Sequence, residues 1–372
     1  MSKVSAKFAQ MRKDMNQSLI ERSEEIDLAL TALIAQQHLL LVGPPGTAKS
    51  LVADTIREWI TGAKRFVVHC CKDTTRNVAF GPIKLSAMRE DRTERALTGG
   101  AADSHILILE EVFKAGPAVL DMFLLLMNER IYREGLVTTN SPLRFLLGVS
   151  NEWSPEGCEA ALAAFFDRFL FRKGVIPIRS KKGIKDLVQL PANGKMTRGH
   201  TPKLSTQITL EELDQAHIEA KALKFSPHTE EAFFAIHNGL GEEGIVPGDR
   251  RLFLSVTAIQ AYAYLCGAVV VEPEHLEVLA HVLWEDPLEG PKAAAKVVGK
   301  IANPVGIAVT GIRSKIEDIL EKMPPAEAVP KLQACQKELA SLKADPRRDL
   351  ALDYVEDCIK TTYNRVIRGH IE

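Results

Sequence analysis

The residues best suited to chemistry form the run GPPGTAKS, from Gly43 to Ser50. The run follows an apolar stretch, His38 to Gly43, that is typical of a short buried strand, and a helical pattern follows it. A strand, a glycine-rich loop and a helix in this order form a phosphate cradle, because backbone N–H groups and the helix N-terminus face the anion. Lys49 would neutralise the β- and γ-phosphates, and the Ser50 hydroxyl would bind Mg²⁺. The residues predicted to bind a nucleotide here are Gly43, Pro44, Pro45, Gly46, Thr47, Ala48, Lys49, Ser50 and Leu51.

Two carboxylates, Glu110 and Glu111, follow the apolar run Ile106 to Leu109. Ligands of open α/β sheets bind at the carboxyl ends of the strands, so both acids are expected near the phosphate loop. Glu110 would hold Mg²⁺ through water, and Glu111 would orient and polarise the attacking water. Such sites normally have Asp at the first position. The extra methylene of Glu110 therefore predicts slow hydrolysis or a slightly displaced ion.

Further polar side chains follow at later strand and helix ends. A third predicted strand ends at Asn151, whose amide could hydrogen-bond the γ-phosphate or the attacking water. Arg168 and Arg172 are four residues apart and share a face if the segment is helical, and arginine can clamp phosphate with two hydrogen bonds. Arg250 and Arg251 open a predicted helix, where cations oppose the helix dipole. Their position indicates another task, such as contact with an anion.

The pattern of strands alternating with helices predicts an α/β fold with a mostly parallel sheet covered by helices on both faces. After it, the sequence is helical and is punctuated by Pro and Gly. The predicted parts are an N-terminal helix at 1–20, a nucleotide-binding α/β domain at 21–178, a basic linker at 179–208, an all-α domain at 209–300 and a helical hairpin at 301–372.

Charge and composition narrow the function classes. The 47 Lys and Arg residues nearly balance the 48 Asp and Glu residues, which gives no general reason to expect nucleic acid or an anionic membrane as partner. Residues 172–203 are an exception, with nine basic residues and one acidic, and this stretch is either a solvated linker or a contact for phosphate or an acidic partner. No apolar run approaches the ~20 residues of a membrane helix, and the N-terminus does not resemble a secretory signal, so a cytoplasmic protein is expected. The six cysteines show no metal or disulfide spacing.

An ordered set of motifs resembles the MoxR branch of the AAA+ ATPases, and most closely its RavA-like subgroup. The resemblance covers about residues 20–285, and its motifs are GPPGTAKS, FGPIKLSAM, LILEEVFKAGPAVLDMFLLLMNERIYREG, GVSNEW, AFFDRFLFR and VPGDRRLFL. Members carry Ala at the position of Ala48. The resemblance implies that Asn151 is sensor 1, that Arg168 is an arginine finger given to a neighbouring subunit and that Arg250 is sensor 2. The alternatives are Arg172 for the finger and Arg251 for sensor 2.

The resemblance also implies an assembly and a task. Residues 80–100 are similar to the family's helix-2 insert and residues 133–144 to its pre-sensor hairpin, which line the opening of a ring. The expected protein is a homo-hexamer with ATP and Mg²⁺ between subunits, a lid domain after the AAA+ core, and chaperone-like remodelling of a protein client beside a partner with a von Willebrand factor A domain. Two alternatives stay open, namely a nucleotide-gated adaptor ring with little hydrolysis and a nucleic-acid-dependent ATPase.

Overall fold

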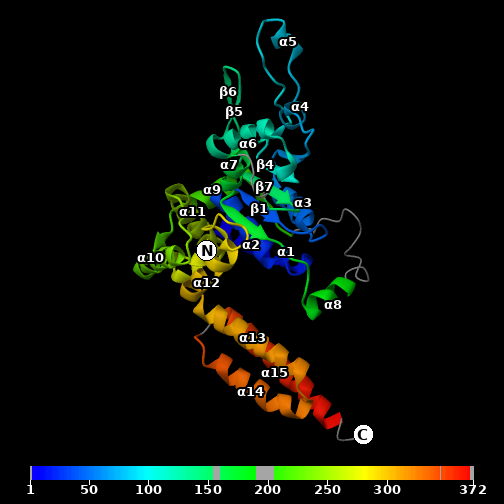
Figure 1. Cartoon of the computed structure of the whole chain (residues 1–372), viewed down its shortest axis with the longest axis vertical. Helices are drawn as coiled ribbons and strands as arrows, with labels where there is room; N and C mark the ends of the chain where they lie inside the picture. The colour runs from blue at the N-terminus through cyan, green and yellow to red at the C-terminus, as the bar shows by residue number, and fades with distance from the viewer. Residues whose placement is uncertain (1, 154–159, 190–204, 344, 369–372) are drawn as a thin grey trace.

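The computed structural model describes residues 2–153, 160–189, 205–343 and 345–368 (Figure 1). Its centre is a five-stranded sheet with the order β3-β4-β7-β1-β8, in which every neighbouring pair is parallel. The strands are β1 (Leu39–Val42), β3 (Arg65–His69), β4 (Ile106–Glu110), β7 (Phe145–Ser150) and β8 (Phe171–Gly174). The predicted α/β class is confirmed.

The middle of the sheet is buried on both faces. All six residues of β7 are buried, and successive side chains of a strand point to opposite faces, so helices must cover both. Gly148 in β7 leaves room for its neighbours, since a Cβ atom there would lie 2.8 Å from the Phe169 ring. The helices of this part are α1 (Lys3–Ser18), α2 (Ser23–Ala35), α3 (Lys49–Trp59), α6 (Pro117–Glu129) and α7 (Ala160–Asp167).

The N-terminal helix α1 is amphipathic as predicted. Phe8, Met11 and Met15 are fully buried and lie on one face, because their spacing is close to one helical turn. The helix packs against α2, α9 (Leu210–Lys221) and α11 (Asp249–Leu265). It therefore joins the sheet domain to the helices that follow it.

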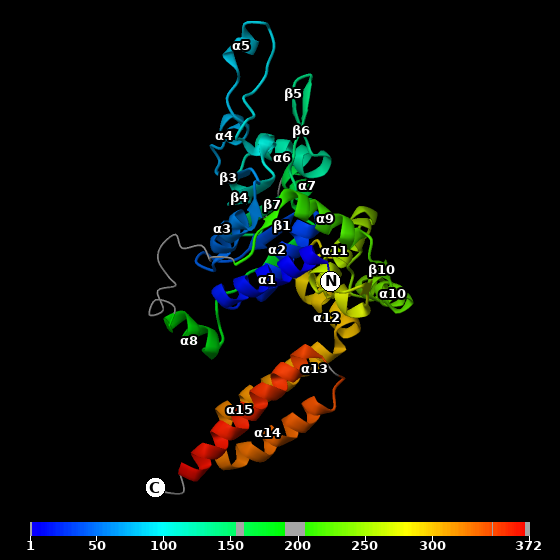
Figure 2. The same ribbon diagram turned by 180° about the vertical axis from the view of Figure 1, so that it is seen from behind.

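Two projections extend from one end of the sheet domain (Figures 1 and 2). One carries α4 (Arg76–Phe80) and α5 (Leu85–Met88), and the other is the hairpin of β5 (Ile131–Glu134) and β6 (Val137–Asn140). They touch at their bases, where Arg95 Nε donates to Glu134 at 3.0 Å and the Phe80 ring lies 5.1 Å from the Tyr132 ring. Both projections therefore extend from a shared, packed base.

The helical domain after the sheet, called the lid below, comprises α9, α10 (Pro227–Glu242), α11, η3 (Pro273–His281) and α12 (Gly290–Ala302). A capping box at Thr209 and Glu212 starts α9, and the side chain of Ser226 caps α10. Short bridges and turns complete the chain: β2 (Ile60–Thr61) with β9 (Ile208–Thr209), β10 (Lys224–Phe225) with β11 (Val270–Val271), η1 (Ala101–Asp103) and η2 (Val112–Lys114).

The tail, expected as a helical hairpin at 301–372, forms three helices. They are α13 (Pro304–Lys322), α14 (Pro325–Ala340) and α15 (Pro346–Arg368), and they begin at prolines because proline fits the first helical turn. The tail buries its own core, which includes Ile316, Leu332 and Val355 and is separate from the main core. A bidentate ion pair between Arg347 and Glu277, at 2.6 and 2.5 Å, ties the tail to the lid.

Two further expectations are corrected. Within the expected linker at 179–208, residues 181–189 form helix α8 (Lys181–Gln189), while residues 190–204 lie outside the described residues. The segment with Arg168 and Arg172 is not one helix, because α7 ends at Asp167 and Arg172 lies in strand β8 beside β1. In the described ranges no helix has the length and apolar character needed to cross a bilayer.

Two histidines, the buried His38 and the half-buried His281, have pKa values below the ordinary one. His38 is fully enclosed, and its Nδ1 accepts a hydrogen bond from the Leu146 N–H at 3.1 Å. Burial, together with the charge of Arg130, keeps the pKa of His38 well below its ordinary value. Burial and the charge of Lys173 lower the pKa of His281 to about 4.

Acidification is expected to destabilise the fold between about pH 6.5 and pH 4. In this window the unfolded chain protonates His38 and His281, whereas the folded chain does not, so lower pH favours unfolding. The loss should be on the order of 2 kcal/mol or more. Urea unfolding at pH 7.5 and pH 5.0 measures it, and His38→Gln should weaken the pH dependence while the exposed His228→Gln should not. An equal free energy of unfolding at both pH values would contradict the assignment.

Candidate active site

The loop after β1 has the geometry of a phosphate cradle. Gly46 and Ala48 adopt left-handed backbone conformations, with φ of 81° and 63°, so Ala48 occupies a conformation that glycine takes more easily. Within the described chain, the N–H groups from Gly46 to Ser50 donate to no acceptor. Helix α3 begins at Lys49, and its positive end adds to the field. The loop is therefore able to accept an anion.

Lys49, Glu111 and Asn151 come together from three separate elements. Lys49 Nζ donates to Pro44 O at 2.9 Å and to Asn151 Oδ1 at 3.2 Å, and Asn151 Nδ2 donates to Glu111 Oε1. Burial lowers the pKa of Lys49, although the charge of Glu111 opposes the shift. Asn151 and Glu111, which were predicted as sensor 1 and as the catalytic base, thus meet Lys49 at the carboxyl ends of β1, β4 and β7.

The backbone of Glu111 is also left-handed, with φ of 53°, which is uncommon for a residue with a side chain. A cavity of about 320 Å³ lies beside Glu111, and its lining includes Lys72, Lys114 and Trp153. Strained backbone conformations are often found at functional sites. Glu111 thus borders a space where a water molecule and a reacting phosphate could meet.

Glu110 has a different partner from the one predicted. Its carboxylate lies 2.5 Å from His69 Nδ1, at the end of the neighbouring strand β3, where His69 and Glu110 are in register. Ser50 is exposed at the start of α3, and the described residues show no hydrogen bond between it and Glu110. The described residues also contain no cluster of three or more His, Cys, Asp or Glu side chains suited to a metal.

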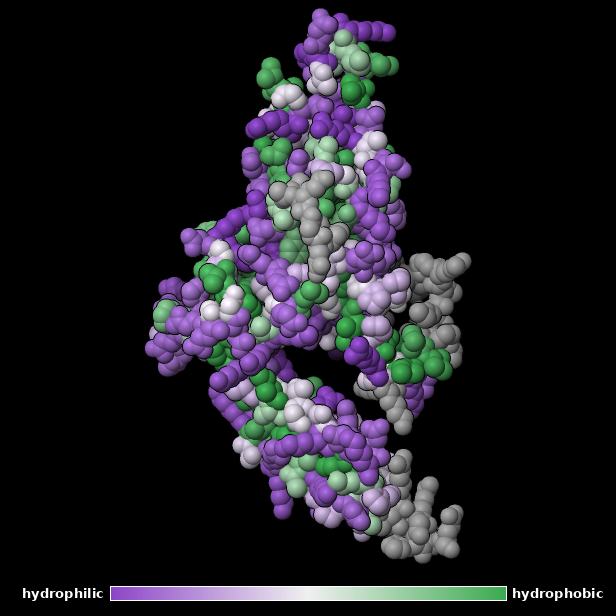
Figure 3. Space-filling view, viewed as in Figure 1, coloured by the Kyte–Doolittle hydropathy of each residue, from purple (hydrophilic) through white to green (hydrophobic). Residues whose placement is uncertain are grey.

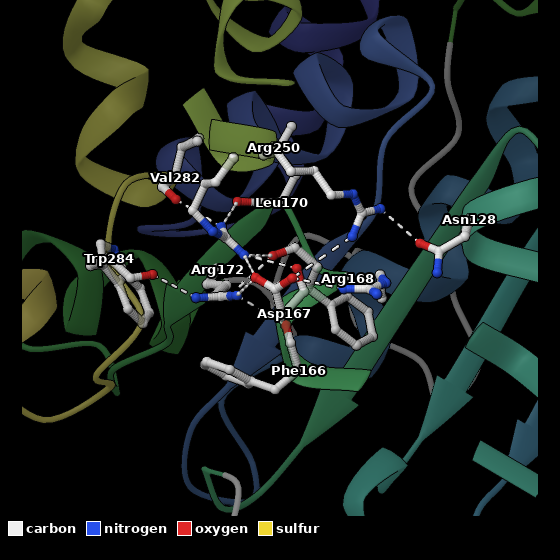
Figure 4. A network of polar contacts seen from close by, with 11 residues as sticks. Asn128, Phe166, Asp167, Arg168, Leu170, Arg172, Arg250, Val282 and Trp284 are labelled. Carbon is white, nitrogen blue, oxygen red and sulfur yellow. Dashed lines mark hydrogen bonds and ion pairs between the residues drawn. The ribbon is translucent and has the colours of Figure 1, made fainter. Parts of the chain in front are cut away.

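A second site lies at the junction of the sheet domain and the lid, where one carboxylate faces four arginines. Figure 4 labels Arg168, Arg172 and Arg250 around it. Asp167 contacts all four at distances from 2.8 to 3.7 Å, and they are Arg168, Arg172, Arg250 and Arg251. Burial alone would raise the pKa of Asp167, but the hydrogen bond and charge of Arg251 and the other arginines outweigh it and hold the pKa below its ordinary value. The cluster keeps an excess of positive charge.

Two of the four arginines are structural. Arg172 is fully buried, donates to the carbonyls of Phe169, Trp284 and Phe166, and lies 4.0 Å above the Phe166 ring. Arg251 is 5% exposed and donates to the carbonyls of Val282, Leu170 and Asp167. Neither guanidinium can leave its carbonyls without losing several buried hydrogen bonds. They are therefore poor candidates for contact with a nucleotide.

Arg168 and Arg250 are more accessible and lie side by side around Asp167 (Figure 4). The Arg168 side chain is 25% exposed, and its Nε is buried without a partner among the described residues. Arg250 is 49% exposed and donates to Asn128 at 2.7 Å. Both have donors available for an added anion.

These two arginines lie far from the loop at Lys49 in the same chain. Strands β1 and β8 are parallel, with Leu39 opposite Phe171 and Val42 opposite Gly174. The loop follows the carboxyl end of β1, whereas Arg168 precedes the amino end of β8. The length of a four-residue strand, roughly 10 Å, separates these edges. Arg168 and Arg250 are thus placed together, away from their own phosphate loop.

Some of the residues that shape both sites were not predicted from the sequence. His69 has a simple signal, since it ends a strand beside the strand of Glu110. Asn128 and Arg22 have none, because their roles come from tertiary contacts. Arg22 is buried and donates from Nε to Thr47 O at 3.1 Å, beneath the phosphate loop.

Comparison with family models places both parts of this arrangement in known families. Residues 6–217 match the model described as the MoxR domain in the MoxR-vWA-beta-propeller ternary systems. Residues 228–297 match an AAA lid domain. The arginine cluster therefore lies where the MoxR domain and the lid domain meet.

Similar proteins agree with these matches. An uncharacterized protein of Methanocaldococcus jannaschii is 34% identical over 343 residues, 92% of this chain and 86% of its own length. The chaperone MoxR1 of Mycobacterium tuberculosis is 26% identical over 170 residues, 44% of this chain and 42% of its own. The solved structure of a proposed ATPase from Cytophaga hutchinsonii aligns with a TM-score of 0.62 and 16% identity over 80% of this chain and 94% of its own, a likeness of fold.

Proposed function

Because the chain belongs to the MoxR family of AAA+ ATPases, we propose that it hydrolyses ATP at the subunit interfaces of a homo-hexameric ring. The observation that carries this proposal is the separation of Arg168 and Arg250 from the loop at Lys49. A second copy of the chain would complete the pocket by bringing its arginines to the phosphates. One subunit binds the triphosphate, and the next supplies positive charge.

The roles within the pocket follow from chemistry. Lys49 and the free N–H groups of its loop would hold the phosphates, and Glu111 would polarise the attacking water while Asn151 orients it. Mg²⁺, held by Ser50 and through water by Glu110, would neutralise phosphate charge. Arg168 would stabilise the charge of the transition state, as an arginine finger does. Arg250, next to it, would contact the same phosphates, which the neighbouring subunit holds. It would therefore act in trans, whereas its prediction as sensor 2 suggests a role within its own subunit.

The task beyond hydrolysis is proposed from the family. We propose that the ring remodels a protein client beside a partner with a von Willebrand factor A domain, in keeping with the systems that the matching model describes. The RavA-like subgroup suggested by the motifs stays a prediction. A cytoplasmic location also stays a prediction.

One observation favours a second candidate, a nucleotide-gated adaptor ring with little hydrolysis. Glu110 pairs with His69, and the longer side chain of Glu stands where Asp is usual. If this pair persists with nucleotide bound, the carboxylate is not available to the hydrated metal ion. ATP would then hold the ring together without being cut at a useful rate.

ATP hydrolysis per subunit is expected to rise steeply with protein concentration, because one chain cannot complete the pocket alone. Phosphate release measured from 10 nM to 10 µM protein, beside sedimentation of the same samples, tests this. A rate per subunit that stays constant while the protein remains monomeric would overturn the proposal. Assembly with nucleotide but without phosphate release would select the adaptor.

A further inference from the structure

Helix α8 presents an apolar face that the described residues leave exposed. Ile184, Leu187 and Val188 are exposed by 51%, 38% and 71%, and their spacing places them on one side of the helix. Figure 3 shows this hydrophobic patch beside the main body. The surrounding sequence is basic, since residues 179–189 contain four basic residues and one acidic residue. Such a helix matches an acidic surface with an apolar floor.

The start of α8 is connected to the phosphate loop through Glu21 and Arg22. Glu21 accepts hydrogen bonds from the backbone N–H groups of Arg179 and Ser180, at 3.1 and 3.2 Å. The adjacent Arg22 donates to Thr47 O in the loop at 3.1 Å. The position of α8 is therefore tied to the side of the subunit that binds the nucleotide.

A groove of complementary character lies on the lid. Its cavity measures about 390 Å³ and is bounded by the loop after α10 and the start of α12. Its floor includes the apolar residues Ile245, Val246 and Leu283. Its carboxylates belong to Glu243, Glu285, Asp286 and Glu289. Lys296 pairs with Glu243 at 2.7 Å and Lys292 pairs with Glu289 at 3.6 Å, so the groove keeps a net negative charge.

The groove lies on the side of the arginine cluster. Pro247 in its lining is three residues before Arg250, and Trp284, which follows Leu283 of the floor, accepts a hydrogen bond from Arg172. Figures 1 and 2 place α8 and the lid helices α10 and α12 on opposite sides of the molecule. The helix and the groove of one chain therefore do not meet.

We propose that α8 of one subunit docks into the acidic groove on the lid of the next subunit. The inference rests on the proposed ring, in which the arginine side of one chain faces the nucleotide side of another. That arrangement turns the neighbour's α8 toward this groove. The basic residues of α8 then meet the carboxylates of the groove, and the apolar face of α8 meets the apolar residues of the groove. The contact joins the nucleotide side of one subunit to the lid of the next.

Charge reversal on either side should weaken assembly, and reversal on both sides should restore it. Arg179→Glu with Lys185→Glu, or Glu243→Lys with Glu289→Lys, is expected to raise the protein concentration needed for half assembly about tenfold. The four changes combined should return it to within about twofold of the unmodified protein. Sedimentation velocity with a slowly hydrolysed ATP analogue measures the effect.

The matched control is Lys331→Glu with Lys337→Glu, two exposed lysines on α14, which should leave assembly unchanged. If the unmodified protein assembles and the reversals have no effect, the docking inference fails while the ring stands. If the unmodified protein never assembles, the proposed ring fails and the docking fails with it.

A lipid surface is the other occupant that a basic amphipathic helix fits. Co-sedimentation with vesicles of phosphatidylglycerol and phosphatidylcholine separates the two. If the unmodified protein binds the vesicles, and if Val188→Asp abolishes this binding but assembles normally, docking on the lid would be overturned. Weakened assembly without vesicle binding would agree with it.

Discussion

Glu111→Gln is expected to keep ATP binding and to lower turnover about 10³-fold or more, which corresponds to roughly 4 kcal/mol of barrier. The amide keeps the size of the side chain and a hydrogen bond to Asn151, but it cannot polarise water as the carboxylate does. Equilibrium binding of a fluorescent ATP analogue and phosphate release at saturating ATP give the two quantities.

The matched control is Lys49→Ala, which should abolish ATP binding itself because the loop loses its buried cation. The two variants together separate capture of the triphosphate from its hydrolysis. Normal hydrolysis by Glu111→Gln would refute the catalytic role of this carboxylate.

Arg168→Ala should lower hydrolysis by about 10³-fold to 10⁵-fold with little effect on ATP binding, because the arginine acts only on the charge of the transition state. Its guanidinium is partly exposed and keeps a buried Nε without a partner among the described residues, so its loss should cost little stability. Arg313→Ala removes an exposed arginine from helix α13 of the tail and is the matched control, with normal hydrolysis expected.

Mixing tests whether Arg168 works in trans. Subunits with Arg168→Ala keep an intact loop and Glu111, and subunits with Glu111→Gln keep Arg168. Mixed rings should therefore contain some complete pockets and recover part of the activity. Absence of any recovery in rings shown to be mixed would mean that Arg168 acts within its own subunit or only on structure.

The phosphate loop and the strand ends could be predicted from the sequence because their signals are local. A buried strand, glycines and a helix start are contiguous in GPPGTAKS, and the carboxyl ends of parallel strands meet by topology. Asn151 and Glu111 therefore lie where their positions along the chain predicted. Such predictions need no knowledge of distant contacts.

The arginines were harder to assign because their environments depend on packing between distant segments. Arg172 and Arg168 look alike in sequence, yet one lies in strand β8 against Phe166 and the other lies in the preceding turn. Arg250 and Arg251 are adjacent, but only the second donates to the buried carbonyls of Leu170 and Val282, which lie just before β8 and just after η3. The two arginines would share a face only if the segment were helical, and Arg172 instead lies in a short strand on the edge of the sheet.

The attachment of the tail has a mechanical consequence. The tail has its own hydrophobic core and meets the lid where α12 runs into α13 and through the ion pair of Arg347 with Glu277. An exposed pair of this kind contributes only about 0–1 kcal/mol and is screened by salt. Raising the ionic strength would therefore weaken one of the two attachments of the tail. The three-helix bundle would then be held to the lid mainly by the connection from α12 to α13 and would change its orientation more freely.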